Sequence, residues 1–315
     1  MTGKVQPHSD SSGPFVMDLT WVSDLTGWAL SADRCAAGLC PEVATTTDGG
    51  QTWHPLPNPP ASIQNGTVDC ASVACVSYLR FATTMLGYLY GPALLLTSDG
   101  GRSWRPQAGL PVDALEPTQV GVYRIVYDHG GCPGPCDRTV EVAPSGSGTW
   151  RTVATIPFSP NGSRQVTAEL VPQGGQDIYI PIYGDVAAGA GTQQAILWRS
   201  LDAGHTWRQL GDPCGAGGTG ANVAIGVAAA AGGFVAALCI PRSSRGGEFV
   251  VTSNNAGSSW GPPHPVPGPF IQLIAAPGSA FLGFEDSLFG RWVGSEGAIW
   301  TSGDGGAHWL RRPFQ

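Results

Sequence analysis

Short apolar runs separated by Gly-, Pro- and Asp-rich segments recur along the whole chain, and within them apolar and polar positions alternate only moderately. Such runs are typical of β-strands that pack on both faces, and no long stretch has the period of an amphipathic helix. The runs fall into successive groups, as in FVMDLTW, GWALS, EVATTT and TWHPL at the start of the chain. The pattern therefore predicts an all-β protein built from repeated four-stranded units.

A Trp closes a short Gly-rich turn at intervals of about fifty residues, a period typical of stacked-repeat architectures. Five copies are readable: TTDGGQTW (46–53), TSDGGRSW (97–104), SLDAGHTW (200–207), SNNAGSSW (253–260) and SGDGGAHW (302–309). A decayed sixth copy is APSGSGTW (143–150). The marker residues are Trp53, Trp104, Trp150, Trp207, Trp260 and Trp309.

Each copy lies between two strand-like runs, which indicates a hairpin whose turn needs residues that tolerate positive φ, here Asp-Gly and Gly-Gly. An acidic or amide side chain in the turn can accept hydrogen bonds from turn N–H groups, and the flanking hydroxyls can satisfy others. These side chains are Asp48, Asp99, Asp202, Asn255 and Asp304. One hairpin cannot bury its apolar face alone, so we expect each Trp to pack against the neighbouring unit.

Six markers predict a six-bladed β-propeller of four-stranded antiparallel blades, with a seven-bladed propeller as the alternative. Residues 15–315 are expected to form this single domain and residues 1–14 a flexible N-terminal segment. The third blade is assigned VGVYRIVYD as its first strand, and the sixth blade is assigned FIQLIAA, AFLGFE, GAIWTS and HWLRR. Because 15–21 supply the first inner strand and 308–313 the last outer strand, we expect the ring to close by packing, without an exchanged strand.

The motif S/T-x-D-x-G-x-T/S-W resembles the Asp-box, or BNR repeat, of sialidases and many other β-propellers, and the copies cover the whole chain. The phrase LTWVSDLTGWAL followed by DGGQTW is also similar to the seven-bladed propellers of photosystem II assembly factors. The Asp-box resemblance implies a propeller with these turns between the third and fourth strands of each blade, away from the ligand face. The turn aspartates are therefore interpreted as structural.

Composition agrees with an all-β protein that binds no nucleic acid. Gly 46 and Pro 27 in 315 residues are turn-rich, and charged residues make up only 12%. A formal net charge of −7 with scattered Lys and Arg disfavours a nucleic-acid partner. There is no apolar run long enough to span a membrane, and we expect no cofactor.

Eight cysteines fall into local pairs, which indicates disulfides formed in an oxidising compartment. The expected pairs are Cys35 with Cys40, Cys70 with Cys75, Cys132 with Cys136 and, by elimination, Cys214 with Cys239. A zinc site is the rival interpretation, disfavoured because only His129 lies close by and no C-x2-C spacing occurs. We expect an extracellular or cell-surface protein whose signal peptide has been removed, with no metal site.

The cysteine pairs fall in the long connections, which in a propeller of this kind share one face. Loops that are pinned in place lose less conformational entropy on binding, so this face is the predicted ligand face. Charge near the axis is expected from four first-strand residues, and aromatic contacts from two tyrosines. The candidate binding residues are Asp18, Arg80, Arg124, Glu169, Tyr90 and Tyr183.

Two function classes follow from these residues. The first is a secreted, monomeric binding propeller that recognises a protein or cell-surface glycan without turnover. The second is a sialidase-like glycoside hydrolase, which would need three Arg on a carboxylate, a Tyr nucleophile with a Glu, and an acid/base Asp. Since first strands are mostly apolar or small, an Arg triad is not expected. We favour the binding protein and assign no catalytic residue.

Overall fold

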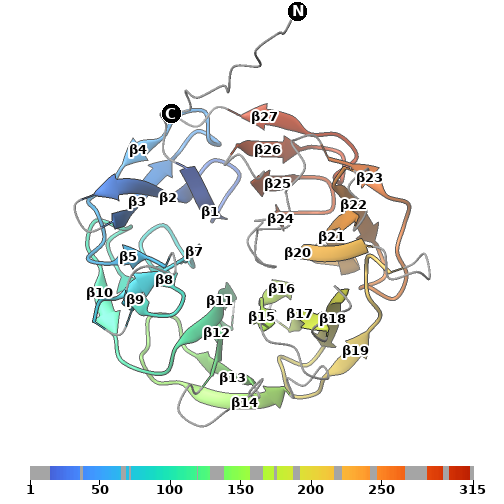
Figure 1. Ribbon diagram of the computed structural model, residues 1–315, viewed down its shortest axis with the longest axis horizontal. Helices are drawn as coiled ribbons and strands as arrows, with labels where there is room; N and C mark the ends of the chain where they lie inside the picture. Colours follow the sequence, from blue (N-terminus) through green and yellow to red (C-terminus); the bar gives the residue numbers. More distant parts are fainter. Residues whose placement is uncertain are drawn as a thin grey trace, which may run out of the picture.

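The computed structural model shows a ring of six four-stranded antiparallel blades around one axis, a six-bladed β-propeller (Figure 1). The residues that it describes are 15–35, 38–64, 69–70, 72–118, 120–127, 138–156, 166–173, 176–186, 192–215, 222–241, 247–266, 282–293 and 298–312. The predicted six-bladed fold is therefore confirmed, and the seven-bladed alternative is not.

Within each blade the strands follow one another from the axis outward, and each sheet comes from one continuous stretch of chain. The strands of blades 1 to 3 are β1 (Phe15–Trp21), β2 (Gly27–Cys35), β3 (Gly38–Thr46), β4 (His54–Pro55); β7 (Tyr78–Phe81), β8 (Gly87–Tyr90), β9 (Leu94–Thr97), β10 (Arg105–Gln107); β11 (Val112–Thr118), β12 (Gly121–Val126), β13 (Arg138–Ala143), β14 (Arg151–Ile156).

Blades 4 to 6 have the same order, except that two short strands share the innermost position of blade 4. Their strands are β15 (Val166–Ala168) with β16 (Val171–Gln173), β17 (Asp177–Val186), β18 (Thr192–Ser200), β19 (Arg208–Leu210); β20 (Asn222–Ala230), β21 (Phe234–Pro241), β22 (Phe249–Ser253), β23 (His264–Pro265); β24 (Leu282–Phe284), β25 (Gly290–Val293), β26 (Ile299–Ser302), β27 (Leu310–Arg312). A parallel pair, β5 (Ser62–Ile63) and β6 (Cys75–Val76), precedes blade 2, and a short 3-10 turn, η1 (Ala231–Gly233), joins β20 to β21.

Two blades differ from the sequence-based assignment. In blade 3 the apolar run VGVYRIV forms the second strand, β12, and the innermost strand is the more polar β11, VDALEPT. In blade 6 the innermost strand is β24 and the second is β25, so AFLGFE supplies the first strand instead of the second. The run FIQLIAA lies outside the described residues. In blade 3 the error arose because the inner strand β11 is less apolar than the buried second strand β12. In blade 6 it arose because FIQLIAA was assigned to the first position, which displaced AFLGFE to the second.

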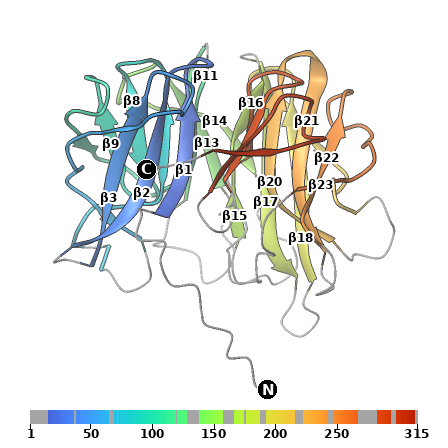
Figure 2. The same ribbon diagram turned by 90° about the horizontal axis from the view of Figure 1, so that it is seen from above.

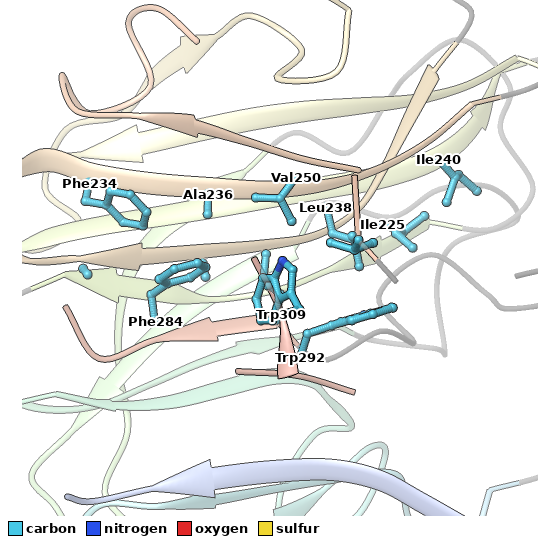
Figure 3. Packing of buried hydrophobic residues seen from close by; sticks show 13 residues of the cluster. Ile225, Phe234, Ala236, Leu238, Ile240, Val250, Phe284, Trp292 and Trp309 are labelled. Carbon is cyan, nitrogen blue, oxygen red and sulfur yellow. The ribbon is translucent and has the colours of Figure 1, made fainter. Parts of the chain in front are cut away.

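The core is divided into six apolar clusters, one at each joint between neighbouring blades, and every marker Trp packs into the joint with the preceding blade. Figure 3 shows the joint of blades 5 and 6, where Trp309 packs with Trp292 and Phe284 among aliphatic side chains such as Leu238 and Val250. Even Trp150 of the decayed copy packs against the joint of blades 2 and 3. The predicted packing of each indole against its neighbouring unit is confirmed, and it fills the spaces between blades.

The ring closes between blades 1 and 6 by side-chain packing. Val16, Leu19 and Ala29 of blade 1 bury against Val293 and Ile299 of blade 6. Both sheets are complete from their own segments, β1 to β4 and β24 to β27. In the described part of the chain, closure thus involves no strand exchange, as expected.

The five readable copies form equivalent turns between the third and fourth strands of their blades. In blade 1 the Thr46 hydroxyl donates to Asp48 Oδ1 at 2.8 Å and accepts from the Gly50 N–H at 3.0 Å, while Asp48 accepts from Thr52 N–H at 2.9 Å. The same bonds recur at residues 97–103, 200–206, 253–259 and 302–308. We call each of these segments, with its Trp, a repeat turn. Their equivalence confirms the predicted role of the Asp, or of Asn255, in holding the turn.

Candidate ligand-binding cavity

The innermost strands surround a cavity of about 350 Å³ on the propeller axis. Figure 2 shows these strands running along the axis between the two faces of the ring. Five carboxylates and two guanidinium groups line the cavity together with two tyrosines: Asp18, Asp113, Glu116, Glu169, Glu285, Arg80, Arg291, Tyr78 and Tyr90. A polar, charged axis thus lies inside a ring of apolar joints.

Arg80 joins the inner strands of three consecutive blades. Its Nη1 donates to Asp18 Oδ2 of blade 1 at 2.6 Å, and its Nε donates to Glu116 of blade 3. Asp18 also accepts hydrogen bonds from the backbone N–H groups of Leu19 at 3.0 Å and Leu79 at 2.8 Å. We call Asp18, Arg80 and Glu116 the axial clamp, because it fixes three blades to one another at the cavity wall.

The axial clamp contains two carboxyls for one guanidinium, so it retains protons. Burial raises the pKa of Glu116 to about 7, although the charge of Arg80 acts in the opposite direction. Burial likewise raises the pKa of Asp18 against the same Arg80 charge. Burial alone would lower the pKa of the Arg80 guanidinium, but the negative charges of Asp18 and Glu116 have the larger combined effect and raise this pKa above the usual range. Arg80 therefore stays charged, while Glu116 titrates near neutrality.

Tyr78 and Tyr90 stack beside the clamp, with ring centroids 5.2 Å apart. Burial, followed by the charges of Glu169 and Asp18, raises the pKa of the Tyr78 hydroxyl. Burial also raises the pKa of Tyr90, and Arg80 only partly offsets it. Both side chains are therefore neutral phenols in the cavity wall, and Tyr78 is the more exposed of the two, since Tyr90 is only 3% exposed.

A second charged group borders the cavity where blades 1 and 6 meet. Arg291 is 2% exposed, pairs with Glu285, and lies over the Trp21 ring with its guanidinium carbon 3.7 Å from the ring centroid. Its Nη2 also donates to the Asp24 carbonyl at 3.2 Å. Burial lowers the pKa of Arg291 to about 10. Arg291 thus remains charged at neutral pH and strengthens the closure of the ring.

Four of the six predicted binding residues lie together at this cavity: Asp18, Arg80, Tyr90 and Glu169. Arg124 does not, because it lies on the second strand, β12, where it pairs with Glu141 at 2.7 Å and covers the Trp150 ring. Its expected place on a first strand is therefore wrong. Tyr183 lies on β17, also a second strand, opposite Thr167 and Ala195.

Four further charged residues line the cavity and are not among the predicted binding residues: Asp113, Glu116, Glu285 and Arg291. A recurring spacing in the sequence could have located Glu285 and Arg291, because each directly follows one member of an aromatic–Gly pair. In three blades an aromatic residue ends the first strand and, after five intervening residues, a Gly begins the second strand. The pairs are Trp21 and Gly27, Phe81 and Gly87, and Phe284 and Gly290. In each pair a Cβ on the Gly would meet the aromatic ring within 3 Å, so the Gly is required.

Three predicted disulfides are confirmed, with Cα–Cα distances of 5.8 Å for Cys35–Cys40, 5.4 Å for Cys70–Cys75 and 5.8 Å for Cys214–Cys239. Cys132 and Cys136 lie outside the described residues. The first bridge joins the end of β2 to the start of β3. Cys70–Cys75 joins the connection between blades 1 and 2 to β6, and Cys214–Cys239 joins the connection between blades 4 and 5 to β21. They therefore pin the connections of the predicted ligand face, and disulfides favour an oxidising, extracellular setting.

Within the ranges that the structure describes, no group of three or more His, Cys, Asp or Glu is arranged to hold a metal ion. No helix among the described residues is long and apolar enough to cross a membrane. The cavity wall itself presents carboxylates, guanidinium groups and phenols.

No protein-family model and no curated protein sequence matches this chain. Among solved structures it is similar to a polysaccharide lyase, an ulvan lyase bound to -[GlcA(1-4)Rha3S]-, with 11% identity over 92% of this chain and 80% of that chain and a TM-score of 0.55. A protein of unknown function from Dyadobacter fermentans shares 12% identity over 95% of this chain and 93% of that chain, with a TM-score of 0.54. YCF48 bound to D1 peptide shares 16% identity over 95% and 82% of the two chains, with a TM-score of 0.48. The similarities to the lyase and to the Dyadobacter protein are similarities of fold.

Proposed function

We propose that this chain is a secreted binding propeller that recognises a protein or a cell-surface glycan through its disulfide-pinned face, without turnover. The proposal extends to the axial cavity, whose wall includes the half-buried Tyr78 ring and would be reached by the part of the ligand that enters the axis. Asp-box turns of the kind found in sialidases and other propellers would then serve only to hold the blades.

The engagement of Arg80 is the observation that carries this proposal. A sialidase-like site needs arginines that are free to clamp a substrate carboxylate, together with an activated Tyr. Here Arg80 is held by Asp18 and Glu116, and Arg291 by Glu285. The raised pKa of Tyr78 opposes formation of a nucleophilic phenolate. Both arginines are therefore held by carboxylates of the cavity wall, and neither is placed to clamp a substrate carboxylate.

The pinned connections support the location of the ligand surface. Each disulfide removes freedom that a loop would otherwise lose on binding, so less of the interaction free energy is spent on ordering. Cys214–Cys239 fixes the connection between blades 4 and 5 directly to the buried strand β21.

A glycan array and a panel of cell-surface proteins, run beside chromogenic glycoside assays, test the proposal. Binding of one ligand class without hydrolysis is expected. Tyr78→Ala should weaken binding by about tenfold, because it removes the more exposed aromatic ring of the cavity wall, whereas Tyr123→Ala on the second strand of blade 3 is the control. Turnover of any glycoside by the wild-type protein would contradict a non-catalytic role.

A sialidase-like glycoside hydrolase remains the second candidate, on one specific observation. Glu116 has a pKa of about 7, in the range of a general acid, and Tyr78 lies close enough to Glu169 for that carboxylate to raise its pKa. If turnover is found, Glu116→Gln should abolish it while ligand binding persists.

A further inference from the structure

Four exposed apolar side chains occupy the same kind of place on four blades. Leu25 is 58% exposed, Met85 49%, Val120 59% and Leu288 58%. Each lies on the short turn between the first and second strands of its blade, beside the axis, in blades 1, 2, 3 and 6 respectively. These turns lie on the same face as the repeat turns, opposite the disulfide-pinned face (Figure 2).

The backbone at this position has a structural task that does not involve the side chain. The carbonyls of Leu25, Met85 and Leu288 accept hydrogen bonds of 2.9, 2.9 and 2.8 Å from Gly49, Gly100 and Gly305 of the repeat turns. In blades 4 and 5 the carbonyls of Gln176 and Gly233 do the same for Ala203 and Ala256, at 2.9 and 2.8 Å. Since Gln and Gly serve equally well there, the fold does not require an apolar side chain.

The apolar positions form one continuous arc. Blades 6, 1, 2 and 3 are consecutive around the closed ring, while the polar Gln176 and the bare Gly233 stand on the two remaining blades. The hydrogen bond from Arg291 to the Asp24 carbonyl ties the turn of blade 1 to blade 6 within this arc. We call Leu288, Leu25, Met85 and Val120 the apolar arc.

Carboxylates border the apolar arc. Asp24 and Asp286 are exposed beside Leu25 and Leu288, and two backbone N–H groups, of Phe289 and Leu288, lower the pKa of Asp286. Hydrogen bonds within the repeat turns of the same blades lower the pKa of three more carboxyls: Asp48, Asp99 and Asp304. The arc thus carries exposed aliphatic groups inside a border in which carboxyls outnumber the exposed Arg102, whose Nη1 donates to the Asp99 carbonyl at 2.9 Å.

We propose that the apolar arc is a docking surface for a protein partner whose apolar side chains are flanked by Lys or Arg. Exposed apolar groups clustered within a polar border are typical of interaction sites, and the carboxylates select a basic partner. An anionic lipid surface would be repelled by the same border. A second copy docked face to face would place the carboxylates against themselves. The surface lies on the face opposite to that of the proposed ligand, so the two proposals stand independently.

A pair of designed helical peptides tests this assignment. One carries a stripe of Leu flanked by Lys, and its twin carries the same Leu flanked by Glu. The Lys peptide is expected to bind the full chain, more weakly as salt rises, and to shift the backbone amide resonances of the arc turns. Leu25→Ser and Leu288→Ser should each weaken binding by about tenfold, as loss of an interface anchor does.

Leu201→Ser and Leu310→Ser are the matched controls, since these leucines are 52% and 67% exposed and lie outside the apolar arc. Both should bind the Lys peptide as the wild type does. Equal binding of the Glu peptide, failure of the Lys peptide to bind, or arc variants that bind normally would each overturn the proposal. Recruitment to anionic vesicles, or a dimer in sedimentation analysis that Leu25→Ser dissociates, would instead assign the arc to lipid or to self-association.

Discussion

At the scale of single residues, the axial clamp decides both stability and charge at the propeller axis. Asp18, Arg80 and Glu116 come from three blades and are held in an environment where burial disfavours every charge among them. A buried ion pair of this kind contributes little net stability compared with apolar packing, but loss of one partner leaves an uncompensated charge. The clamp is therefore sensitive to single substitutions and tolerant of matched ones.

Replacement of Arg80 by Met should lower the free energy of unfolding by about 3 to 5 kcal/mol, the cost of leaving a buried charge unpaired. Urea denaturation measures this loss. In the triple variant Asp18→Asn, Arg80→Met, Glu116→Gln the unpaired charges are absent, so most of the loss should be restored. A single variant as stable as the wild type would show that the clamp does not hold the blades.

The pH dependence of stability should carry the signature of Glu116. Its pKa is raised from an ordinary value of 4.5 to about 7, so the folded state binds the proton more tightly than the unfolded state. The free energy of unfolding should consequently fall as pH rises from about 4.5 to about 7, and Glu116→Gln should flatten this part of the profile.

The turn aspartates act in a separate pH range. The pKa of Asp99 is lowered to about 2, so protonation of its carboxyl removes stability only as pH falls below about 4. Denaturant midpoints measured from pH 3 to pH 8 distinguish the two; an unchanged profile in Glu116→Gln would contradict the assignment.

At the scale of elements, the repeat turn is a hydrogen-bonded unit in which the first hydroxyl both donates and accepts a hydrogen bond. Thr97 Oγ1 donates to Asp99 and accepts from the N–H of the buried Gly101 at 3.0 Å. Ser provides the same hydroxyl in blades 4 to 6, at positions 200, 253 and 302. The turn therefore needs the oxygen and not the methyl group.

Thr97→Val should lower the free energy of unfolding by about 1 to 3 kcal/mol, because it leaves a buried N–H without an acceptor. Thr97→Ser should cost much less, as the native Ser copies indicate. Thermal and urea unfolding of the two variants side by side give the comparison. Equal losses in both would mean that the methyl group, through its packing, holds the turn.

The elements also show how far the sequence could predict this protein. The Trp repeat predicted the blade number, the turn positions and the packing of every indole, since these depend on local spacing. The inner strand of blade 3 was missed, because β11 combines Asp113, Glu116 and Pro117 and so lacks the apolar pattern of a strand. In blade 6 the run FIQLIAA was assigned as the first strand, which displaced AFLGFE to the second position. The clamp was missed for a related reason: Asp18 and Arg80 are 62 residues apart, and only ring closure brings them together with Glu116.

At the scale of the whole molecule, the propeller is a cycle of joints in which each blade is bound only to its two neighbours. Five of the joints connect blades that follow one another in sequence, whereas the joint of blades 1 and 6 brings together the first and last blades. Formation of that joint closes a loop of nearly the whole chain, so it carries the largest entropic cost. We expect it to open more readily than the others.

Ile299→Ala tests this expectation, because Ile299 is 3% exposed and packs against Val16, Leu19 and Ala29 across the closing joint. Truncation of a buried Ile should cost about 2 to 5 kcal/mol. The effect should be local in the first instance: amide hydrogen exchange should accelerate in β1 and β25 before it does in β20 to β22. Ile240→Ala, in the joint of blades 5 and 6, is the matched control, since it should cost a similar free energy without selectively exposing β1. If both variants accelerate exchange uniformly around the ring, the six joints open as one cooperative unit and closure has no weakest point.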